Sequence, residues 1–280
     1  MGSKLLVARN LLKVWTLLLA SCAALGAVGW LIDGYGLSLI FVFAALLLGM
    51  ATYWYADRAV LGLARARELP VGEAPGLHST VERLAAVARV AKPRLYLMRD
   101  GLPRACCVGR GPRSAAIAVS VGLLQALSPA ELEGALAHEL AHIRRRDVLV
   151  QCVAVLIAAV TVEMSRIGGW FRRALLFVLG PVAAAFVHLL LSPKREFGAD
   201  RDAALISGSP HGLASALIKL DQASELVEFR GSPVAEPIYI INPFEEEGLA
   251  GLFVTHPPVT ERVRRLRALD AGGMSDLQAA

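Results

Sequence analysis

The stretch Ser128-Pro-Ala-Glu-Leu-Glu-Gly-Ala-Leu-Ala-His-Glu-Leu-Ala-His142 decides the fold, because it defines a helix and places two histidines on one side of it. Ser128 is a favoured N-cap residue, proline suits the first helical position, and Glu131 completes a capping box. We therefore expect a helix over residues 130–146. His138 and His142 are four residues apart, so their imidazoles lie on one face of this helix, one turn apart.

Two imidazoles at this spacing can hold one Zn²⁺ at about 2.0–2.1 Å. Glu139 projects beside such a metal, where it can take a proton from a water molecule. An H-E-x-x-H sequence also occurs by chance. The apolar neighbours Ala137, Leu140 and Ala141 indicate burial, however, and buried histidines without partners are costly, which favours a metal site.

A catalytic zinc site needs a third protein ligand and keeps its fourth position open. We expect Glu196 to be this ligand, since it stands in the first turn of a helix that begins near Pro193, directly after an apolar segment. Asp200 follows one turn later on the same face, and we expect it to accept the outer N–H of a ligand histidine. The alternative is a solvated charged face paired with Arg195 and Arg201.

Much of the chain is apolar enough for a membrane protein. Of its 280 residues 55% are hydrophobic and 19% are charged, which excludes disordered, collagen-like and coiled-coil classes. Residues 14–32 and 34–56 contain no Asp, Glu, Lys or Arg, and each run is long enough to cross the hydrocarbon core as a helix. Because the second run follows the first at once, we expect a retained hairpin with a turn at residues 34–36, and no cleaved signal peptide.

Residues 148–162 and 174–191 form two weaker apolar runs, each of which fits a tilted span, an arm of a membrane-embedded hairpin or a buried core helix. Basic residues flank the first hairpin at both ends, so we expect both ends in the cytoplasm. Three arginines between the weaker runs oppose this rule, so either their loop crosses against it or the second hairpin does not fully span. The net charge of +5 follows this membrane pattern better than nucleic-acid binding.

These patterns predict four parts: a transmembrane hairpin over residues 1–56, a cytoplasmic half with a small sheet and the H-E-x-x-H helix over 57–147, a second membrane hairpin over 148–191, and a cytoplasmic half with the third zinc ligand over 192–280. The four cysteines do not resemble a disulfide framework, and we expect reduced, buried thiols. Further expected elements are a helix opened by a capping box at Ser79 and Glu82, strands over 94–98, 105–108 and 115–121, helices from Pro193, from Pro210 to about Phe229 and over 260–269, and a loop over 230–257.

The chain resembles the HtpX-type membrane zinc metallopeptidases, which are relatives of the CAAX prenyl endopeptidases. The resemblance runs from the paired N-terminal apolar runs to about residue 267. Its four motifs stand in the family's order: Ala115-Ala-Ile-Ala-Val-Ser-Val121 with Gly122-Leu-Leu124, Ala137-His-Glu-Leu-Ala-His142, Arg195-Glu-Phe-Gly-Ala-Asp200, and Thr255-His-Pro-Pro258 with Glu261-Arg262. The chain departs from the family in having Arg104-Ala105-Cys106 in place of the usual Asn-Ala-Phe, and Ser192-Pro193 in place of Ser-Arg.

The resemblance implies a mainly α membrane protein with a small β-sheet and a gluzincin-like metallopeptidase domain with transmembrane hairpins. It implies one Zn²⁺ per chain on His138, His142 and Glu196, with Glu139 as catalytic base. It implies an integral, multi-pass protein of the inner or plasma membrane whose active site faces the cytoplasm and cleaves membrane or misfolded proteins in quality control. Expected partners are protein or peptide substrates and the lipid bilayer, but no nucleic acid.

In such enzymes an edge strand lines the cleft and pairs with the substrate backbone, and Ala115 to Val121 matches that strand. We expect zinc to polarise the scissile carbonyl while Glu139 moves a proton from water to the leaving amine. His256 is a candidate catalytic residue that stabilises the oxyanion, with Arg262 behind it; alternatively His256 closes a turn before Pro257.

Two other classes of function stay open at this point. One is a non-catalytic membrane scaffold or transporter component with a structural metal site, which would be closed by a fourth protein ligand. The other is a zinc hydrolase that acts on a lipid or a small amide. An extended edge strand favours peptides over the latter.

Overall fold

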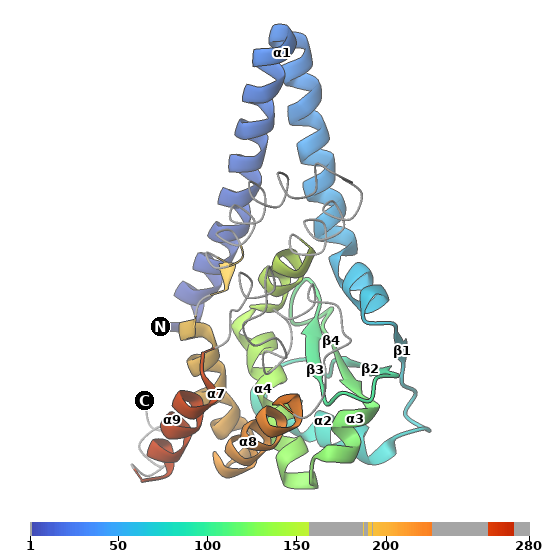
Figure 1. The fold of residues 1–280 in the computed structure, drawn as a ribbon, viewed down its shortest axis with the longest axis vertical. Coiled ribbons are helices and arrows are strands. Elements are labelled where there is room, and N and C mark those ends of the chain that lie inside the picture. Colours follow the sequence, from blue (N-terminus) through green and yellow to red (C-terminus); the bar gives the residue numbers. More distant parts are fainter. Residues whose placement is uncertain (1, 157–186, 188–189, 192, 226–256, 272–280) are drawn as a thin grey trace.

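The computed structural model describes residues 2–156, 187, 190–191, 193–225 and 257–271. It shows a long helical hairpin that rises from a body of helices packed around one small sheet (Figure 1). The fold is therefore mainly helical with a small mixed sheet. Most of the second predicted hairpin, residues 230–256 of the predicted loop over 230–257, and the last nine residues lie outside the described part of the chain.

Helix α1 (Gly2–Leu63) forms the hairpin, because its helical geometry breaks at Asp33 and Gly34. Gly34 has a φ of +67°, a conformation that glycine adopts without the clash a Cβ atom would cause. The chain reverses its direction at this point, so the two arms run side by side (Figure 1). The predicted turn is confirmed to within a residue, and the second arm continues beyond residue 56 to Leu63.

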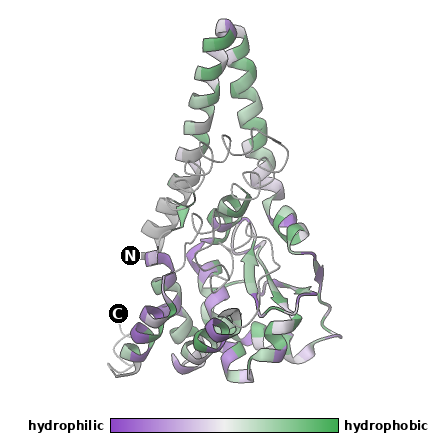
Figure 2. Ribbon diagram, viewed as in Figure 1, coloured by the Kyte–Doolittle hydropathy of each residue, from purple (hydrophilic) through white to green (hydrophobic). Residues whose placement is uncertain are grey.

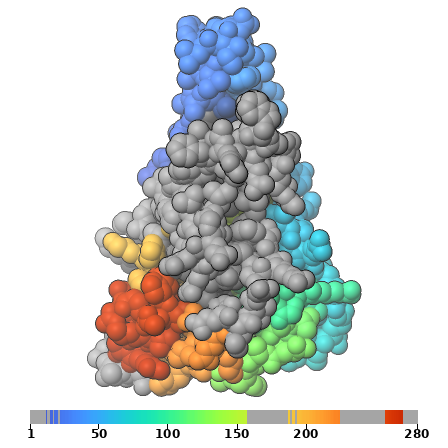
Figure 3. Space-filling view, in the orientation of Figure 1, coloured from blue at the N-terminus to red at the C-terminus, as the bar shows by residue number. Residues whose placement is uncertain are grey.

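The outer part of α1 carries an apolar surface that the rest of the described protein leaves uncovered. The range Leu18–Leu63 is long and apolar enough to cross a membrane, and only 6% of its most apolar window is buried; among the described residues it is the one helix with this property. Figure 2 shows the hydrophobic colouring of both arms, and in Figure 3 the outer end of the hairpin projects beyond the rest of the molecule. Leu31, for example, is 81% exposed, which in water would be a large unfavourable surface.

The sheet has four strands in the order β1-β2-β4-β3. Strands β2 and β4 are parallel, whereas β1 pairs with β2 and β3 pairs with β4 in antiparallel fashion. The three predicted strands are confirmed with their bounds shifted by at most one residue. The bounds are Ala66–Glu68 for β1, Arg94–Met98 for β2, Ala105–Val108 for β3 and Ala116–Ser120 for β4.

The prediction that residues 115–121 form the edge strand of the sheet is wrong. Strand β4 pairs with β2 along one side and with β3 along the other, so neither of its sides is open. Its side chains are buried along its whole length, as is typical of an inner strand that is covered on both faces. The edge strands of the described sheet are β1 and β3, and β3 is the one that packs against helix α4 (Pro129–Arg145), the central helix of the body.

That central helix is α4 (Pro129–Arg145), and its predicted capping box is confirmed. The Glu131 side chain accepts the Ser128 backbone N–H at 2.8 Å, while the Ser128 hydroxyl accepts the Glu131 N–H. Glu131 also accepts hydrogen bonds at 2.7 Å from Ser215 and from Lys219 of α8 (His211–Glu225). The start of α4 is thus fixed both within its own chain segment and against a neighbouring helix.

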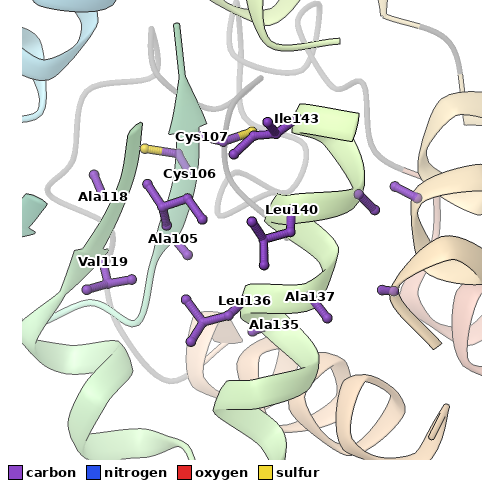
Figure 4. Packing of buried hydrophobic residues seen from close by; sticks show 14 of the residues in the cluster. Ala105, Cys106, Cys107, Ala118, Val119, Ala135, Leu136, Ala137, Leu140 and Ile143 are labelled. Atoms are coloured by element: carbon purple, nitrogen blue, oxygen red, sulfur yellow. The ribbon is translucent and has the colours of Figure 1, made fainter. Parts of the chain in front are cut away.

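The sheet and two helices bury opposite faces of α4. Leu136, Leu140 and Ile143 point toward strand β3 and fill the core between helix and sheet (Figure 4). On another side α4 packs against α7 (Pro193–Ser207) and α8. A Cβ atom on Gly134 would collide with the backbone of Leu213, so glycine is what allows α4 and α8 to approach backbone to backbone.

The remaining helices are α2 (Pro75–Ala88), α3 (Val121–Ala126) and α9 (Val259–Ala271). The predicted capping box at Ser79 and Glu82 is wrong, because α2 begins four residues earlier at Pro75, whose fixed φ suits the first helical position. Ser79 therefore lies inside the helix, where its hydroxyl donates to the Gly76 carbonyl oxygen at 2.9 Å.

The predicted helix starts at Pro193, Pro210 and Thr260 are confirmed within one residue. The prediction of reduced, buried thiols is also confirmed, since all four cysteines are free and buried.

Helix α2 ends at Arg89, which has a φ of +56° in the left-handed region. A non-glycine residue there is strained by its Cβ atom. We expect Arg89→Gly to stabilise the protein by about 1 kcal/mol, which raises the melting temperature of a chain of this size by roughly 2 °C. Thermal unfolding in detergent measures this effect. Arg89→Ala, which keeps the Cβ atom, is the control; an equal shift in both variants would contradict the explanation.

Candidate metal site

Two helices bring three predicted ligands together at the centre of the body. His138 and His142 come from α4 and Glu196 from the first turn of α7, and all three residues are at least 95% buried. The Nε2 atoms of the two histidines are 3.1 Å apart. The Glu196 carboxylate lies 3.5 Å from His138 Nε2 and 3.6 Å from His142 Nε2.

These spacings fit a single metal ion. Four ligands at about 2.0–2.1 Å from a tetrahedral ion are roughly 3.3 Å from one another. The three distances found here bracket that value, and one ligand atom from each residue lies within 4.8 Å of the others. The described residues His138, His142 and Glu196 thus have the donor atoms and the geometry of a zinc-type site with room for further ligands.

The outer ring nitrogens of both histidines face buried carboxylates. Asp200 Oδ1 lies 3.0 Å from His138 Nδ1, and Asp147 Oδ2 lies 3.3 Å from His142 Nδ1. A carboxylate accepts hydrogen bonds, so each ring carries its proton on Nδ1 and directs the lone pair of Nε2 toward the centre. Two lone pairs that face each other at 3.1 Å repel unless a proton or a metal cation lies between them, so this contact favours positive charge at the centre of the site.

Two buried arginines complete this arrangement. Arg262 of α9 donates to Asp200 through two nitrogens, at 2.9 and 2.7 Å. Arg195 Nε lies 3.5 Å from Asp147 Oδ2. Asp200 therefore stands between a histidine ring and Arg262, whereas Asp147 stands between a ring and two guanidinium groups, since Arg145 Nε also lies 3.8 Å from its Oδ2.

The net negative charge of the buried side chains around the site favours binding of a cation. Its described buried groups comprise the carboxylates of Glu139, Glu196, Asp147 and Asp200 and the guanidinium groups of Arg195 and Arg262. With neutral histidines this set carries two more negative charges than positive ones. A divalent cation would balance them, whereas an unbalanced charge in a buried site is costly.

The same excess of negative charge raises the pKa of both histidines. Burial lowers the pKa of His142, but Glu196 and Asp147 outweigh burial and raise it to about 9. Burial likewise opposes protonation of His138, whose pKa is nevertheless raised by Asp200 and Glu196. The surroundings therefore favour positive charge at both rings, which a bound cation can supply in place of protons.

Two arginines link the end of α4 to α7. Arg144 and Arg145, in the last turn of α4, contact the Asp202 carboxylate of α7 at 2.8 and 3.1 Å. Asp202 lies six residues after Glu196 on the same helix. These ion pairs add to the packing of the helix that carries Glu196 against the helix that carries the two histidines.

Glu139 lies on the side of the site that faces strand β3. It is 2% exposed and comes within hydrogen-bonding reach of the Cys107 thiol. Burial and the Glu139 charge together raise the pKa of Cys107 and of Cys106, so both thiols stay protonated. The acidic residue of the H-E-x-x-H motif is thus adjacent to the edge strand as well as to the histidines.

The prediction from sequence did not include Asp147, which lies in this site, and it did include His256, which is not among the described residues. Asp147 follows three arginines just after α4, and its place directly beyond the helix end, five residues after His142, was the signal that could have revealed it. His256 lies outside the described residues. Arg262, expected behind His256, contacts Asp200.

Comparison with known proteins identifies the protein family and several relatives of this chain. The family description "Peptidase family M48" matches residues 72–270. The protease HtpX homolog of Pelotomaculum thermopropionicum is 40% identical over 278 residues, covering 93% of this chain and 99% of its own length. The protease HtpX homolog of Pyrococcus abyssi is 40% identical over 269 residues, covering 89% of this chain and 93% of its own length.

A solved structure shares the fold. The crystal structure of S. mikatae Ste24p superposes with a TM-score of 0.50 at 20% sequence identity. The match covers 93% of this chain and 66% of the Ste24p chain. The common architecture therefore extends over nearly the whole of the present protein.

The buried pair of Arg262 and Asp200 generates a stability prediction. We expect Arg262→Met to destabilise the protein by about 3–5 kcal/mol, because it leaves a charged carboxylate buried without its guanidinium partner. Thermal or urea unfolding measures the change. Adding Asp200→Asn to this variant should recover part of the loss, since the uncompensated charge is then gone.

Arg264→Met on the same helix is the matched control. Arg264 is exposed and pairs with Glu261 at the surface, where ion pairs contribute little to stability. If Arg262→Met unfolds at the same temperature as Arg264→Met, the buried pair does not have the importance assigned to it.

Proposed function

The chain belongs to peptidase family M48 and is a membrane-anchored metalloprotease, and we propose that His138, His142 and Glu196 hold a catalytic zinc ion in it. The observation that supports this most directly is the spacing of the ligand groups: the two Nε2 atoms are 3.1 Å apart, and they lie 3.5 and 3.6 Å from Oε2 and Oε1 of Glu196. Two imidazole nitrogens and one carboxylate oxygen are a ligand set that suits zinc.

The proposed site is catalytic because of the number of its ligands. A structural zinc site is closed by four protein ligands, whereas a catalytic site has three and leaves a position for water or substrate. The metal-binding group found among the described residues has three. This argues against the alternative of a non-catalytic scaffold with a structural metal.

Bound zinc would supply a Lewis acid for the scissile carbonyl oxygen and would lower the pKa of a water molecule beside it. Glu139 is the proposed catalytic base. Its carboxylate, next to His138 in the same helix, accepts the proton of the attacking water and passes it to the leaving amine. Asp147 and Asp200 keep the histidine rings oriented through the Nδ1 contacts described above.

Strand β3 is the proposed place for the substrate backbone. It is the edge of the sheet nearest α4 among the described residues, and it lies beside Glu139. An extended peptide can add to such an edge through backbone hydrogen bonds, which select for chain conformation more than for sequence. This favours a broad specificity for unfolded protein segments over a lipid or small amide substrate, and agrees with a role in removing membrane or misfolded proteins.

The proposed topology keeps the four parts expected from the sequence, with residues 1–56 as the core of a transmembrane hairpin and 148–191 as a second membrane hairpin. Both ends of α1 would then lie in the cytoplasm together with the zinc site. The exposed apolar arms of α1 and the basic residues that flank them support this arrangement. His256 remains the proposed stabiliser of the oxyanion.

Removing the proposed base should abolish peptide hydrolysis without removing the metal. We expect Glu139→Gln to lower the rate of casein cleavage by at least about 100-fold, since an amide cannot accept the proton. Zinc content, measured by atomic absorption on protein purified in detergent, should stay near one ion per chain. Chelation should stop cleavage by the wild-type protein, and added Zn²⁺ should restore it.

Glu133→Gln is the control, because Glu133 lies on the same helix but pairs with Arg83 at the surface. Unchanged cleavage by Glu139→Gln, or equal losses in the two variants, would contradict the proposed role of Glu139.

The proposed orientation can be tested with single cysteines, since the four native thiols are buried. Tyr35→Cys places a thiol near the turn of α1 and Ser79→Cys places one on the body, and both positions are exposed. A membrane-impermeant maleimide should label Tyr35→Cys in intact cells and label Ser79→Cys only after permeabilisation. The reverse pattern would show that the site faces the other side of the membrane.

A further inference from the structure

Two arginines lie against aromatic rings in the inner part of the second arm of α1. The guanidinium carbon of Arg110 is 4.6 Å from the centre of the Trp54 ring, and that of Arg58 is 5.8 Å from the centre of the Tyr55 ring. Trp54 and Arg58 are four residues apart in α1 and therefore lie on one face of it. Arg110 comes from the turn between β3 and β4, so two distant segments of the chain bring positive charge to neighbouring rings.

The turn between β3 and β4 has a defined shape that holds Arg110 in this place. The Arg110 N–H donates to the Ser114 hydroxyl at 3.3 Å, and the Ser114 N–H donates to the Gly111 carbonyl oxygen at 3.0 Å. Gly109 opens the turn with a φ of +147°, and a Cβ atom there would collide with the backbone at the end of the turn. The same turn carries the exposed Arg113. Its backbone therefore presents a basic surface next to α1.

These arginines have no acidic partner within the described part of the chain. Arg58, Arg110 and Arg113 form no ion pair with any described carboxylate, whereas a surface arginine such as Arg83 pairs with Glu133 at 2.7 Å. Positive charges that gather without a carboxylate repel one another. An anion from outside the described chain would relieve this repulsion.

The position of Trp54 along α1 matches the surface of a lipid bilayer. Trp54 comes 20 residues after Gly34, where the hairpin turns, and this length of helix spans about 30 Å, the thickness of the hydrocarbon core. Residues 34–56 contain no charged residue, and Trp54 is 54% exposed. Tryptophan and tyrosine are typical of the level at which the hydrocarbon meets the headgroups. Basic side chains beside these rings are then at the depth of the lipid phosphates.

We propose that Arg58 and Arg110, together with Arg113 of the same turn, bind the headgroup of an anionic phospholipid at the bilayer surface nearest the body. Guanidinium groups recognise phosphate oxygens through paired hydrogen bonds, and they stack on aromatic rings at the same time. The exposed rings of Trp54 and Tyr55 would lie where the headgroup meets the acyl chains. This inference rests on the insertion of α1 in the membrane and does not depend on the zinc site.

The lipid contact would fix one end of the proposed substrate strand at the membrane. Strand β3 ends at Val108, and the turn that carries Arg110 follows at once. Cys107, one residue before that end, is the residue within hydrogen-bonding reach of Glu139. A peptide paired with β3 would therefore be cleaved close to the bilayer surface. This consequence, unlike the lipid contact itself, rests on the proposed function.

The test measures the dissociation constant of phosphatidylglycerol for the full chain in detergent, by native mass spectrometry that resolves single bound lipids. We expect phosphatidylglycerol to bind more tightly than phosphatidylcholine, because only the former carries a net negative charge. Arg58→Gln and Arg110→Gln should each weaken binding of phosphatidylglycerol about 5-fold, the usual contribution of one basic residue at an anionic lipid surface. Neither change should affect binding of phosphatidylcholine.

Matched variants separate this site from net charge and from folding. Arg83→Gln removes the same charge from α2 and should leave the affinity for phosphatidylglycerol unchanged. Arg58→Lys combined with Arg110→Lys keeps both charges and should bind the lipid more tightly than the corresponding pair of glutamines. The glutamine variants should cleave casein in detergent at the wild-type rate, which shows that the body is folded. Millimolar inorganic phosphate should not displace the lipid, because free phosphate has no acyl chains to lie along α1.

An activity measurement tests the consequence for β3. In phosphatidylcholine vesicles, added phosphatidylglycerol should speed cleavage of a membrane-anchored peptide by the wild-type protein, and Arg58→Gln combined with Arg110→Gln should lose this difference. If phosphatidylglycerol binds as expected but has no such effect, the consequence for β3 is wrong and the lipid site stands.

Three results would overturn the lipid site itself: equal wild-type affinities for the two lipids, an equal loss in Arg83→Gln, or displacement of the lipid by inorganic phosphate. A chain that selects phosphatidylglycerol but binds no zinc would overturn the proposed function and leave the lipid site in place.

Discussion

The inner nitrogens of His138 and His142 lie 3.1 Å apart in a site that is almost completely buried. Because Asp200 and Asp147 accept the outer protons of the two rings, the atoms that approach each other so closely are both acceptors. Positive charge between them, from a proton or a metal ion, makes this contact favourable. The rest of the body is arranged around that requirement, since the sheet supports one side of α4 while α7 brings the carboxylate of Glu196, the proposed third ligand, to the other.

Buried ion pairs give little net stability, because desolvation of the two charges offsets their attraction. The pairs of Arg262 with Asp200 and of Arg195 with Asp147 are therefore poor candidates for stabilising elements, although each is costly to break. Their value lies in geometry. A carboxylate fixed by a guanidinium group can orient an imidazole in a way that an apolar core of equal volume cannot. The presence of two such units, one for each histidine, indicates that orientation of the rings is what these buried charges serve.

Local rules of sequence were sufficient for most of the described elements, although not for β1 and α3, and for placing the two proposed ligands of α4 on one face. The capping box at Ser128 and Glu131 placed the helix, and the spacing of four residues placed His138 and His142 on one face. The same rule failed at Ser79, where an earlier proline starts the helix first. The edge strand was also misplaced, since the parallel pairing of β4 with β2 joins segments separated by strand β3 and leaves no local trace in either sequence. Asp147 was missed for a similar reason: its role depends on a left-handed turn at Arg146, a residue whose type does not predict that conformation.

The position of the edge strand changes how the site can be reached. Had β4 been at the edge, a substrate backbone would have paired with a strand that in fact has both neighbours in place. With β3 at that position, an added strand would lie along the side of the sheet that faces α4, next to Glu139 and hence next to the metal ligands. Backbone pairing would then place a scissile peptide bond beside the base without any contact to the substrate's side chains. A protease that must accept many unfolded segments benefits from this arrangement, because hydrogen bonds to an extended backbone are common to all of them.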